Sequence, residues 1–378
     1  MRIVMVSAHY ELLDGRIFHH EARAAVAAGH EVVLVHWDRK GGGDREEKTV
    51  DGVRTISLPI PIRGNLLSKA VRFRGIRKTL AEEVVRQRPD LVHCHDLETL
   101  PIGVDVKQEL GVPLLYDAHE DYPAMVAMTN RVAARAFARL ESRLLARVDR
   151  VVTVNEILRE KYAKRQPTTV VANFPQRSLS ETRPTPRDRA LAGKIVVVYV
   201  GGISRTRGLV ELLDAVKRVG SSLPMHVLVV GKALDTLDCV EEARARGLGG
   251  AVTVRPWVPV TEIPAILASG DIGYAVYNPT RSNAQASPVK MFEYMAAGLP
   301  VLANEGFPVP DAVVGKWRCG LLVPCEPAAI TKALHQLAAD ADLRREMGER
   351  GREAIRKEYN WEGQARNLLA VYASLAKA

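Results

Sequence analysis

Short apolar segments alternate with segments of helical periodicity along most of the chain. In the first half, the apolar segments are rich in Val, Ile and Leu. They predict strands at residues 3–6, 31–35, 53–57, 91–93, 114–116, 151–154 and 170–172. Helical patterns fall between most of them, for example at 16–28, 66–88 and 130–147. Buried strands separated by helices are typical of a parallel sheet that is covered on both faces.

The same alternation restarts in the second half. A segment rich in proline and charge at 174–189 is interpreted as a linker. Further strands are predicted at 194–200, 226–231, 252–254, 272–277, 301–303 and 320–323, and the chain beyond them is almost entirely helical. The predicted class is therefore α/β, with two Rossmann-like, doubly wound parallel-sheet domains. Their predicted bounds are 1–174 and 193–357, with a linker at 175–192 and a C-terminal helical segment at 358–378.

Two domains of this kind predict a ligand site in the cleft between them, at the carboxyl ends of the strands. The residues that directly follow strands are therefore the candidates for chemistry.

Composition excludes several other classes of protein. The 378 residues contain no run of eighteen apolar residues, so no membrane-spanning helix is expected. Residues 1–7 lack the features of a signal peptide and are interpreted as a first strand. The four cysteines form no CxxC pair, which fits a reducing cytoplasm without disulfides. No GxSxG, Walker A or HExxH motif is present, which argues against serine hydrolases, nucleoside triphosphatases and zinc proteases.

The formal net charge of +9 is unevenly distributed. Residues 61–80 hold six basic side chains and no acid, interleaved with apolar residues. This pattern predicts contact with an anionic acceptor or with an anionic membrane surface, and hence peripheral association with the inner membrane face. The alternative is a solvated helix face whose arginines pair with acids elsewhere. No nucleic-acid-binding motif is present, so no nucleic-acid partner is expected.

One segment of the second half carries the most specific signal, beginning at Ser287, Pro288 and Val289 and continuing as a short helix. A helix N-terminus stabilises an anion, and Lys290 in the first turn adds a formal charge. Glu293, about one turn further on, can accept hydrogen bonds from vicinal hydroxyls. A diphosphate joined to a ribose needs both features. The alternative is an ordinary amphipathic helix capped by Ser287, with Pro288 at its first position.

A second candidate follows the strand at 194–200. Gly201 and Gly202 would let backbone N–H groups approach a ligand, and Arg205 and Arg207 can bind phosphate oxygens. A plain turn from strand to helix is the alternative.

Candidates also follow strands of the first half. His119 has an ordinary pKa near neutrality, and Asp117, Glu120 or Asp121 could orient it. His95 and Asp96 are expected to line a cleft. With His93 they also resemble part of a metal site, but no further ligands with matching spacing stand out, and no metal is predicted. Asp14 and Arg16, at the start of the first helix, are placed on the acceptor side.

With these motifs, the chain resembles a known family, the retaining GT-B-fold glycosyltransferases of family 4 (glycosyl transferases group 1). The resemblance runs over nearly the whole length, through DGRIFHHEARAAVAAGHEVVLV, DLVHCHDLETLPIG, LLYDAHEDYP, VDRVVTVNE, VVANFP, YVGGISRTRGLVELLDAV, SPVKMFEYMAAGLPVLA and CGLLV. It implies two Rossmann-like domains that face a central cleft, and a final helix that packs back toward the N-terminal domain.

The resemblance also implies roles for single residues. Glu293 matches a carboxylate that binds the nucleotide ribose, Arg207 a basic residue that contacts the diphosphate, and His119 a histidine near the transferred sugar. Backbone amides at 287–290 would cover the phosphates. This sequence departs from the family in two places. Gln285 replaces the first carboxylate of a Glu-x7-Glu pattern, and Gly201-Gly202 replaces a Gly-Arg pair, so that Arg205 or Lys290 would have to substitute for the missing arginine.

The expected function is transfer of a sugar, with retention, from a UDP- or GDP-sugar to an acceptor hydroxyl, in cell-surface polysaccharide or glycolipid biosynthesis. Lys290, Arg207 and the helix dipole would stabilise the leaving nucleoside diphosphate, so no metal or other cofactor is expected. The acceptor would be lipid-linked or, alternatively, a soluble small molecule. An alternative of another class, suggested by Gln285, is a sugar-nucleotide-binding protein without transfer activity.

Overall fold

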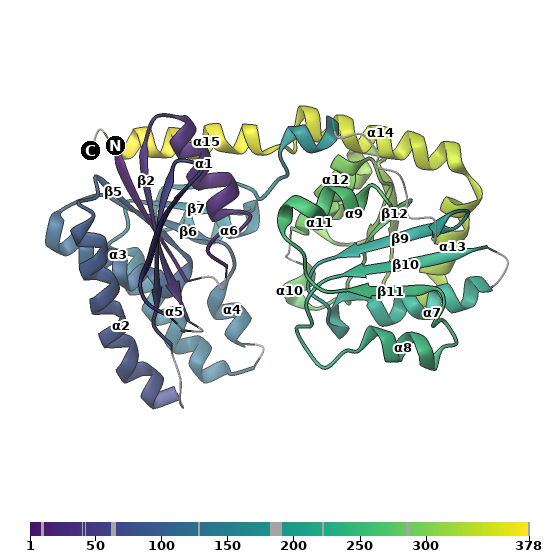
Figure 1. The fold of residues 1–378 in the computed structure, drawn as a ribbon, viewed down its shortest axis with the longest axis horizontal. Helices are drawn as coiled ribbons and strands as arrows, with labels where there is room; N and C mark the ends of the chain where they lie inside the picture. The colour runs from purple at the N-terminus through teal and green to yellow at the C-terminus, as the bar shows by residue number, and fades with distance from the viewer. Residues whose placement is uncertain are drawn as a thin grey trace. The chain divides into compact units, whose positions relative to one another are not determined.

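A computed structural model describes residues 1–8, 11–39, 41, 43–61, 66–127, 129–181, 191–220, 223–284 and 287–376, excluding the side chains of 66–71, 281 and 282. It divides into two compact units (Figure 1). The first unit comprises Met1–Asn173 and Gly363–Ala378, and the second comprises Phe174–Glu362.

The described part of the first unit contains an eight-stranded sheet in the order β3-β4-β2-β1-β5-β6-β7-β8. All neighbours are parallel except β3 and β4, which are antiparallel. The strands are β1 (Arg2–Ser7), β2 (Glu31–Asp38), β3 (Glu46–Val50), β4 (Val53–Pro59), β5 (Leu91–His95), β6 (Leu114–Ala118), β7 (Arg150–Thr153) and β8 (Thr168–Val170).

Helices cover both faces of this sheet. The chain moves from β1 outward to β4 and then returns to β5, and right-handed crossovers in opposite directions place their helices on opposite faces. Figure 1 shows α2 and α3 beside each other along one side of the strands, away from α1 and α15. The helices are η1 (Ile17–Ala22, π-helical), α1 (Arg23–Ala27), α2 (Leu66–Arg86), α3 (Asp96–Leu110), α4 (Tyr122–Ala127), α5 (Arg131–Leu145), α6 (Glu156–Tyr162) and α15 (Trp361–Leu375).

The C-terminal helix α15 belongs to the first unit from Gly363 onward. Its Tyr372 is fully buried, and the phenol oxygen lies 3.0 Å from Nδ1 of His93 at the centre of β5. The Gln364 side chain also accepts a hydrogen bond of 2.9 Å from the Ala172 backbone N–H. The end of the chain is thus tied to the core of the first unit by specific polar contacts.

The described part of the second unit contains a six-stranded parallel sheet in the order β11-β10-β9-β12-β13-β14. Apolar clusters cover both of its faces. Its strands are β9 (Ile195–Val200), β10 (Met225–Val230), β11 (Val252–Arg255), β12 (Ile272–Ala275), β13 (Val301–Asn304) and β14 (Gly320–Val323). Its helices are η2 (Arg177–Glu181), η4 (Arg205–Arg207), α7 (Leu209–Val219), α8 (Cys239–Ala245), η6 (Val260–Glu262), α9 (Ile263–Leu267), α10 (Arg281–Ala284), α11 (Val289–Ala297), α12 (Pro308–Trp317), α13 (Pro327–Ala339) and α14 (Ala341–Lys357).

The predicted class is confirmed, because both units are doubly wound and their sheets are parallel except at the edge strand β3. Strand order reverses between β1 and β5 in the first sheet and between β9 and β12 in the second. In folds of this kind, ligands bind outside the carboxyl ends of the strands at such a reversal. None of the helices in the described part of the chain is long and apolar enough to cross a lipid bilayer.

Candidate functional site

Helix α11 presents an uncapped N-terminus. Its N-cap residue is Pro288 in an extended conformation, and no side chain among the described residues caps it. The alternative in which Ser287 caps the helix and Pro288 begins it is therefore wrong, because the helix begins one residue later, at Val289. The N–H groups of the first turn have few partners within a helix, so this end can accept an anion.

Lys290 brings its ammonium to the end of β9. Its Nζ lies 3.5 Å from the ring centroid of Tyr199 and 5.4 Å from that of Tyr277. The Arg207 guanidinium lies 4.8 Å from the same Tyr277 ring. Burial and the neighbouring Arg207 charge both lower the pKa of Lys290. Lys290 and Arg207 thus meet over the Tyr277 ring at the point where strand order reverses, and a bound anion would favour the charged form of Lys290.

The glycines after β9 make room for this arrangement. Gly201 has φ of 136°, and a Cβ at this position would lie 2.9 Å from the Lys290 Nζ. At Gly202 a Cβ would lie 2.3 Å from a methyl carbon of Leu234. The positive φ at Gly201 favours glycine, and a Cβ there would also crowd the Lys290 ammonium, whereas the Leu234 side chain beside Gly202 is exposed and can move.

Glu293 lies one turn into α11 and is the ionisable group closest in sequence to Lys290. Burial raises its pKa to about 7, although the charge of Lys290 opposes the shift. Among the described residues, none forms a hydrogen bond or an ion pair with this carboxylate. A group poised between its charged and neutral forms in this way is typical of a functional site.

The two tyrosines were not singled out from the sequence. Tyr199 lies within β9 and donates a hydrogen bond of 2.5 Å to the Gly202 carbonyl. Tyr277 is fixed by the Asn304 side chain, which exchanges two hydrogen bonds of 2.7 and 2.8 Å with its backbone. The sequence signal that could have identified Tyr277 is its position as an aromatic residue at the end of the predicted strand 272–277.

The other predicted donor-site residues are placed less favourably. The Arg205 guanidinium lies 3.3 Å from the Glu242 carboxylate on α8, whereas Arg207 faces Tyr277. The structure thus brings only Arg207 to Lys290. Gln285 lies outside the described residues.

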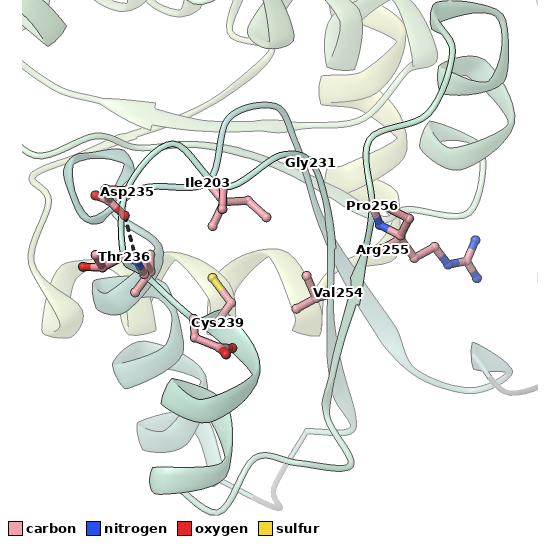
Figure 2. Close-up of a pocket in the computed structure, with 11 residues that line it drawn as sticks. Ile203, Gly231, Asp235, Thr236, Cys239, Val254, Arg255 and Pro256 are labelled. Atoms are coloured by element: carbon pink, nitrogen blue, oxygen red, sulfur yellow. Dashed lines mark hydrogen bonds between the residues drawn. The ribbon is translucent and has the colours of Figure 1, made fainter. Parts of the chain in front are cut away.

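A pocket of about 360 Å³ opens beside this site, at the carboxyl ends of β10 and β11 (Figure 2). Ile203, Val254 and Pro256 give it apolar walls and Asp235 adds charge, whereas the Arg255 guanidinium points away from these residues. Asp235 also orders the loop, since it accepts hydrogen bonds of 2.8 Å from the N–H groups of Arg205 and Leu237. The volume of the pocket is within the range of small-molecule binding sites.

The first unit holds a separate cluster, at the carboxyl ends of β5 and β6. His119 lies between two carboxylates, with Nδ1 3.2 Å from Asp96 and Nε2 3.1 Å from Asp117. Burial opposes a charge on His119, but the two carboxylates outweigh it and hold its pKa well above the ordinary value. Asp96 adopts φ of 65°, a strained conformation of the kind found at functional sites. The two carboxylates thus favour the protonated form of His119, and both of its ring nitrogens face acids.

Arg16 is the buried cation of this cluster and contacts two of its carboxylates. Its Nη2 lies 2.9 Å from Asp117, its Nε 2.9 Å from Glu21, and its Nη1 donates to the Val171 carbonyl at 2.8 Å. Only 5% of the residue is exposed. Arg16 was predicted to face an acceptor, and the structure instead commits its donors to buried partners.

His95 is also fully buried, and burial lowers its pKa to about 4 despite the hydrogen bond to Asp117. Its Nδ1 lies 3.4 Å from Nε2 of His119. Asp14 begins the first helical segment by accepting hydrogen bonds of 2.8 and 2.9 Å from the N–H groups of Arg16 and Ile17. His95 and Asp14 therefore support the cluster from within the protein. His119 and Asp96 form its partly exposed edge.

Four side chains of this cluster offer metal-ligand atoms within 4.8 Å of one another, namely Glu21, His93, His95 and Asp117. Glu21 and Asp117 are remote in sequence from His93 and His95, so spacing could not reveal the complete group. The Arg16 guanidinium already contacts both carboxylates. A fixed cation therefore supplies the positive charge that these acids require.

Comparison with known proteins assigns both units. Residues 15–173 match the Glycosyl transferase 4-like domain, and residues 184–354 match the Glycosyl transferases group 1 family. The chain belongs to this family of GT-B glycosyltransferases and is an enzyme of that class.

Relatives in other organisms agree with this assignment. The chain is 28% identical to a D-inositol 3-phosphate glycosyltransferase of Segniliparus rotundus, over 82% of this chain and 76% of the relative. It is 22% identical to a glycogen synthase of Mycobacterium tuberculosis, over 98% and 94% of the two chains.

Solved structures share the fold. A sucrose-phosphate synthase from Thermosynechococcus elongatus superposes with a TM-score of 0.79 at 19% identity, covering 99% of this chain and 98% of that one. Anabaena HepE in complex with UDP and glucose gives a TM-score of 0.73 at 15% identity, covering 99% and 100%.

Proposed function

We propose that this enzyme transfers a sugar from a UDP- or GDP-sugar to an acceptor hydroxyl with retention of configuration. The observation that carries the proposal is the convergence of Lys290, Arg207 and the uncapped α11 N-terminus at one strand-order reversal. Negative charge grows on a departing nucleoside diphosphate, and preorganised cations stabilise it in the transition state. The HepE structure with UDP and glucose supports a donor of this class.

The remaining parts of the donor have candidate positions nearby. Glu293 would accept hydrogen bonds from the ribose hydroxyls, and its ionised form would be favoured by Lys290. The pocket at the ends of β10 and β11 would receive the base between its apolar walls (Figure 2). We propose that the protein cations do the work of charge neutralisation, without a metal ion or other cofactor.

His119 would present a fixed positive edge to the transferred sugar. Because both ring nitrogens face carboxylates, the proton of the acceptor hydroxyl would pass to a donor phosphate oxygen instead. Attack on the face from which the diphosphate departs would then give retention. The acceptor is proposed to be lipid-linked, as in the building of cell-surface polysaccharide or glycolipid.

The basic segment at 61–80 is described only in part. Residues 62–65 lie outside the described chain, and the side chains of 66–71 are not described. Arg77 forms an ion pair with Asp105, while Arg72 and Arg74 are exposed. A soluble acceptor remains the second candidate.

Titration calorimetry with UDP and GDP tests the donor site. One of the two should bind, and binding should weaken in Glu293→Ala but not in the control Glu241→Ala, whose side chain is 63% exposed. The anomeric configuration of the product, followed by NMR with the matching nucleotide sugar, tests retention. Absence of binding by either nucleotide would overturn the proposal.

A further inference from the structure

The exposed face of α5 has an unusual composition. Arginine recurs at every fourth position from Arg131 to Arg143 and again at Arg147, two residues beyond the end of α5, and all five arginines are exposed. The exposed positions between them hold only aliphatic residues, including Val132, which is 76% exposed, and Leu140, which is 38% exposed. We call the exposed residues between 131 and 147 the α5 face. It contains no acidic side chain.

The arginines of this face have no ion-pair partner within the described part of the chain. The single acid of α5, Glu141, is buried on the opposite side, where it accepts a hydrogen bond of 2.7 Å from Tyr162 and one of 2.9 Å from Lys161. Helix α5 therefore cannot balance its own charge. Arg165 adds a further cation next to the helix, since it donates a hydrogen bond to Ser142.

Helix α14 shows how an ordinary solvated helix of this protein is built. Its arginines alternate with acids, and Arg345 lies 2.9 Å from Asp342 while Arg350 lies 3.7 Å from Glu346. Such pairs at spacings of three and four stabilise an exposed helix. The α5 face has the same density of arginine without the acids, and it has exposed aliphatic side chains in their place.

We propose that the α5 face binds an anionic lipid bilayer, with the helix axis in the plane of the headgroups. Arginines attract anionic lipids, while aliphatic side chains on the same face enter the boundary between headgroups and acyl chains. The neighbouring helix α4 adds Met125, which is 40% exposed. A soluble polyanion would use the arginines but would gain little from Val132 and Leu140, so these exposed residues favour a membrane.

The α5 face is close in sequence to His119, which would link membrane binding to the transfer reaction. Strand β6 ends just before His119, and the chain continues directly into α4 and α5. If the proposed function is correct, docking of α5 would hold the His119 edge close to a lipid-linked acceptor. The membrane contact itself does not depend on that function.

Vesicle co-sedimentation tests this proposal. The full chain is mixed with vesicles of phosphatidylcholine alone, or with vesicles that also contain phosphatidylglycerol at a mole fraction of about 0.3. Each mixture is measured at low and at high salt. The test variant replaces Arg135, Arg139 and Arg143 by Gln. The matched control replaces three arginines of α14 by Gln, at 345, 350 and 356. Thermal unfolding and nucleotide binding verify that each variant is folded.

Wild type should bind the anionic vesicles and release them at high salt. The α5 variant should lose about 100-fold in partition coefficient, because each basic residue near an anionic leaflet contributes about a factor of five. The α14 control should bind as wild type does, and Leu140→Gln should weaken vesicle binding without changing retention on heparin. The proposal is overturned if wild type ignores anionic vesicles or if both triple variants lose affinity equally. Binding to heparin without binding to vesicles would also overturn it, in favour of a polyanion partner.

Discussion

Replacement of Glu293 by Gln should stabilise the protein and weaken its donor binding at the same time. Burial raises the pKa of this carboxyl from 4.5 to about 7 in the folded protein. Between these two values the folded state holds a proton that the unfolded state releases. The free energy of unfolding therefore falls as pH rises through this window, and above it the full penalty for a buried charge remains.

The size of the effect follows from the two pKa values. The native ionised form is disfavoured by about 1.4 kcal/mol for each pKa unit, which gives about 3 kcal/mol at pH 8 and about 1 kcal/mol at pH 5. Gln has the same shape without the charge. The stability difference between Glu293→Gln and wild type should therefore grow by about 2 kcal/mol from pH 5 to pH 8.

Urea unfolding followed by tryptophan fluorescence measures this difference, since every tryptophan except Trp37 lies in the second unit. The same variant should lose about 10- to 100-fold in affinity for the nucleoside diphosphate, because an amide oxygen is a weaker acceptor for the ribose hydroxyls. The control Glu241→Gln should change neither quantity. Destabilisation of Glu293→Gln at pH 8, or a stability difference independent of pH, would show that Glu293 has a structural partner and would refute the reasoning.

Three further substitutions probe the rest of the site. Arg16→Leu should destabilise the first unit by about 3–5 kcal/mol, because it leaves two buried carboxylates without their cation, and a loss below about 1 kcal/mol in urea unfolding would contradict this. Gly201→Ala should reduce affinity for the nucleoside diphosphate, since its Cβ displaces the Lys290 ammonium; unchanged affinity in calorimetry would argue against that placement. His119→Gln should slow transfer in steady-state assays without removing a titration between pH 6 and 8, because the pKa of His119 lies well above its ordinary value. Loss of such a titration would mean that His119 acts as a base.

The fold could be predicted from the sequence wherever apolar strands alternate with helices. Strand β3 was missed because it is an exposed edge strand whose residues, from Glu46 to Val50, are mostly polar, so that apolar periodicity gives no signal. The predicted strand at 170–172 lies slightly later than β8, which ends at Val170. The first helix was predicted as one segment from residue 16, whereas the structure has six π-helical residues before α1.

The donor site was accessible from local sequence because Lys290 and Glu293 lie on one short helix. The cluster around His119 was not, since Arg16 and Asp117 are separated by 101 residues and meet only through the sheet. The local pattern showed that Arg16 follows a strand, but the ion pairs that bury it depend on tertiary packing. The α5 face was not predicted from the sequence, because defining it requires knowing which residues of that helix are exposed.

Paired binding of UDP and uridine to wild type and to Lys290→Met tests the central claim most directly, with GDP and guanosine measured in parallel. If Lys290 and the α11 N-terminus hold the diphosphate, wild type should prefer the diphosphate over its nucleoside strongly. The variant should lose about 10- to 100-fold of that preference while its affinity for the nucleoside is unchanged. An equal preference in wild type and Lys290→Met, with Lys316→Met as the exposed control, would contradict the account.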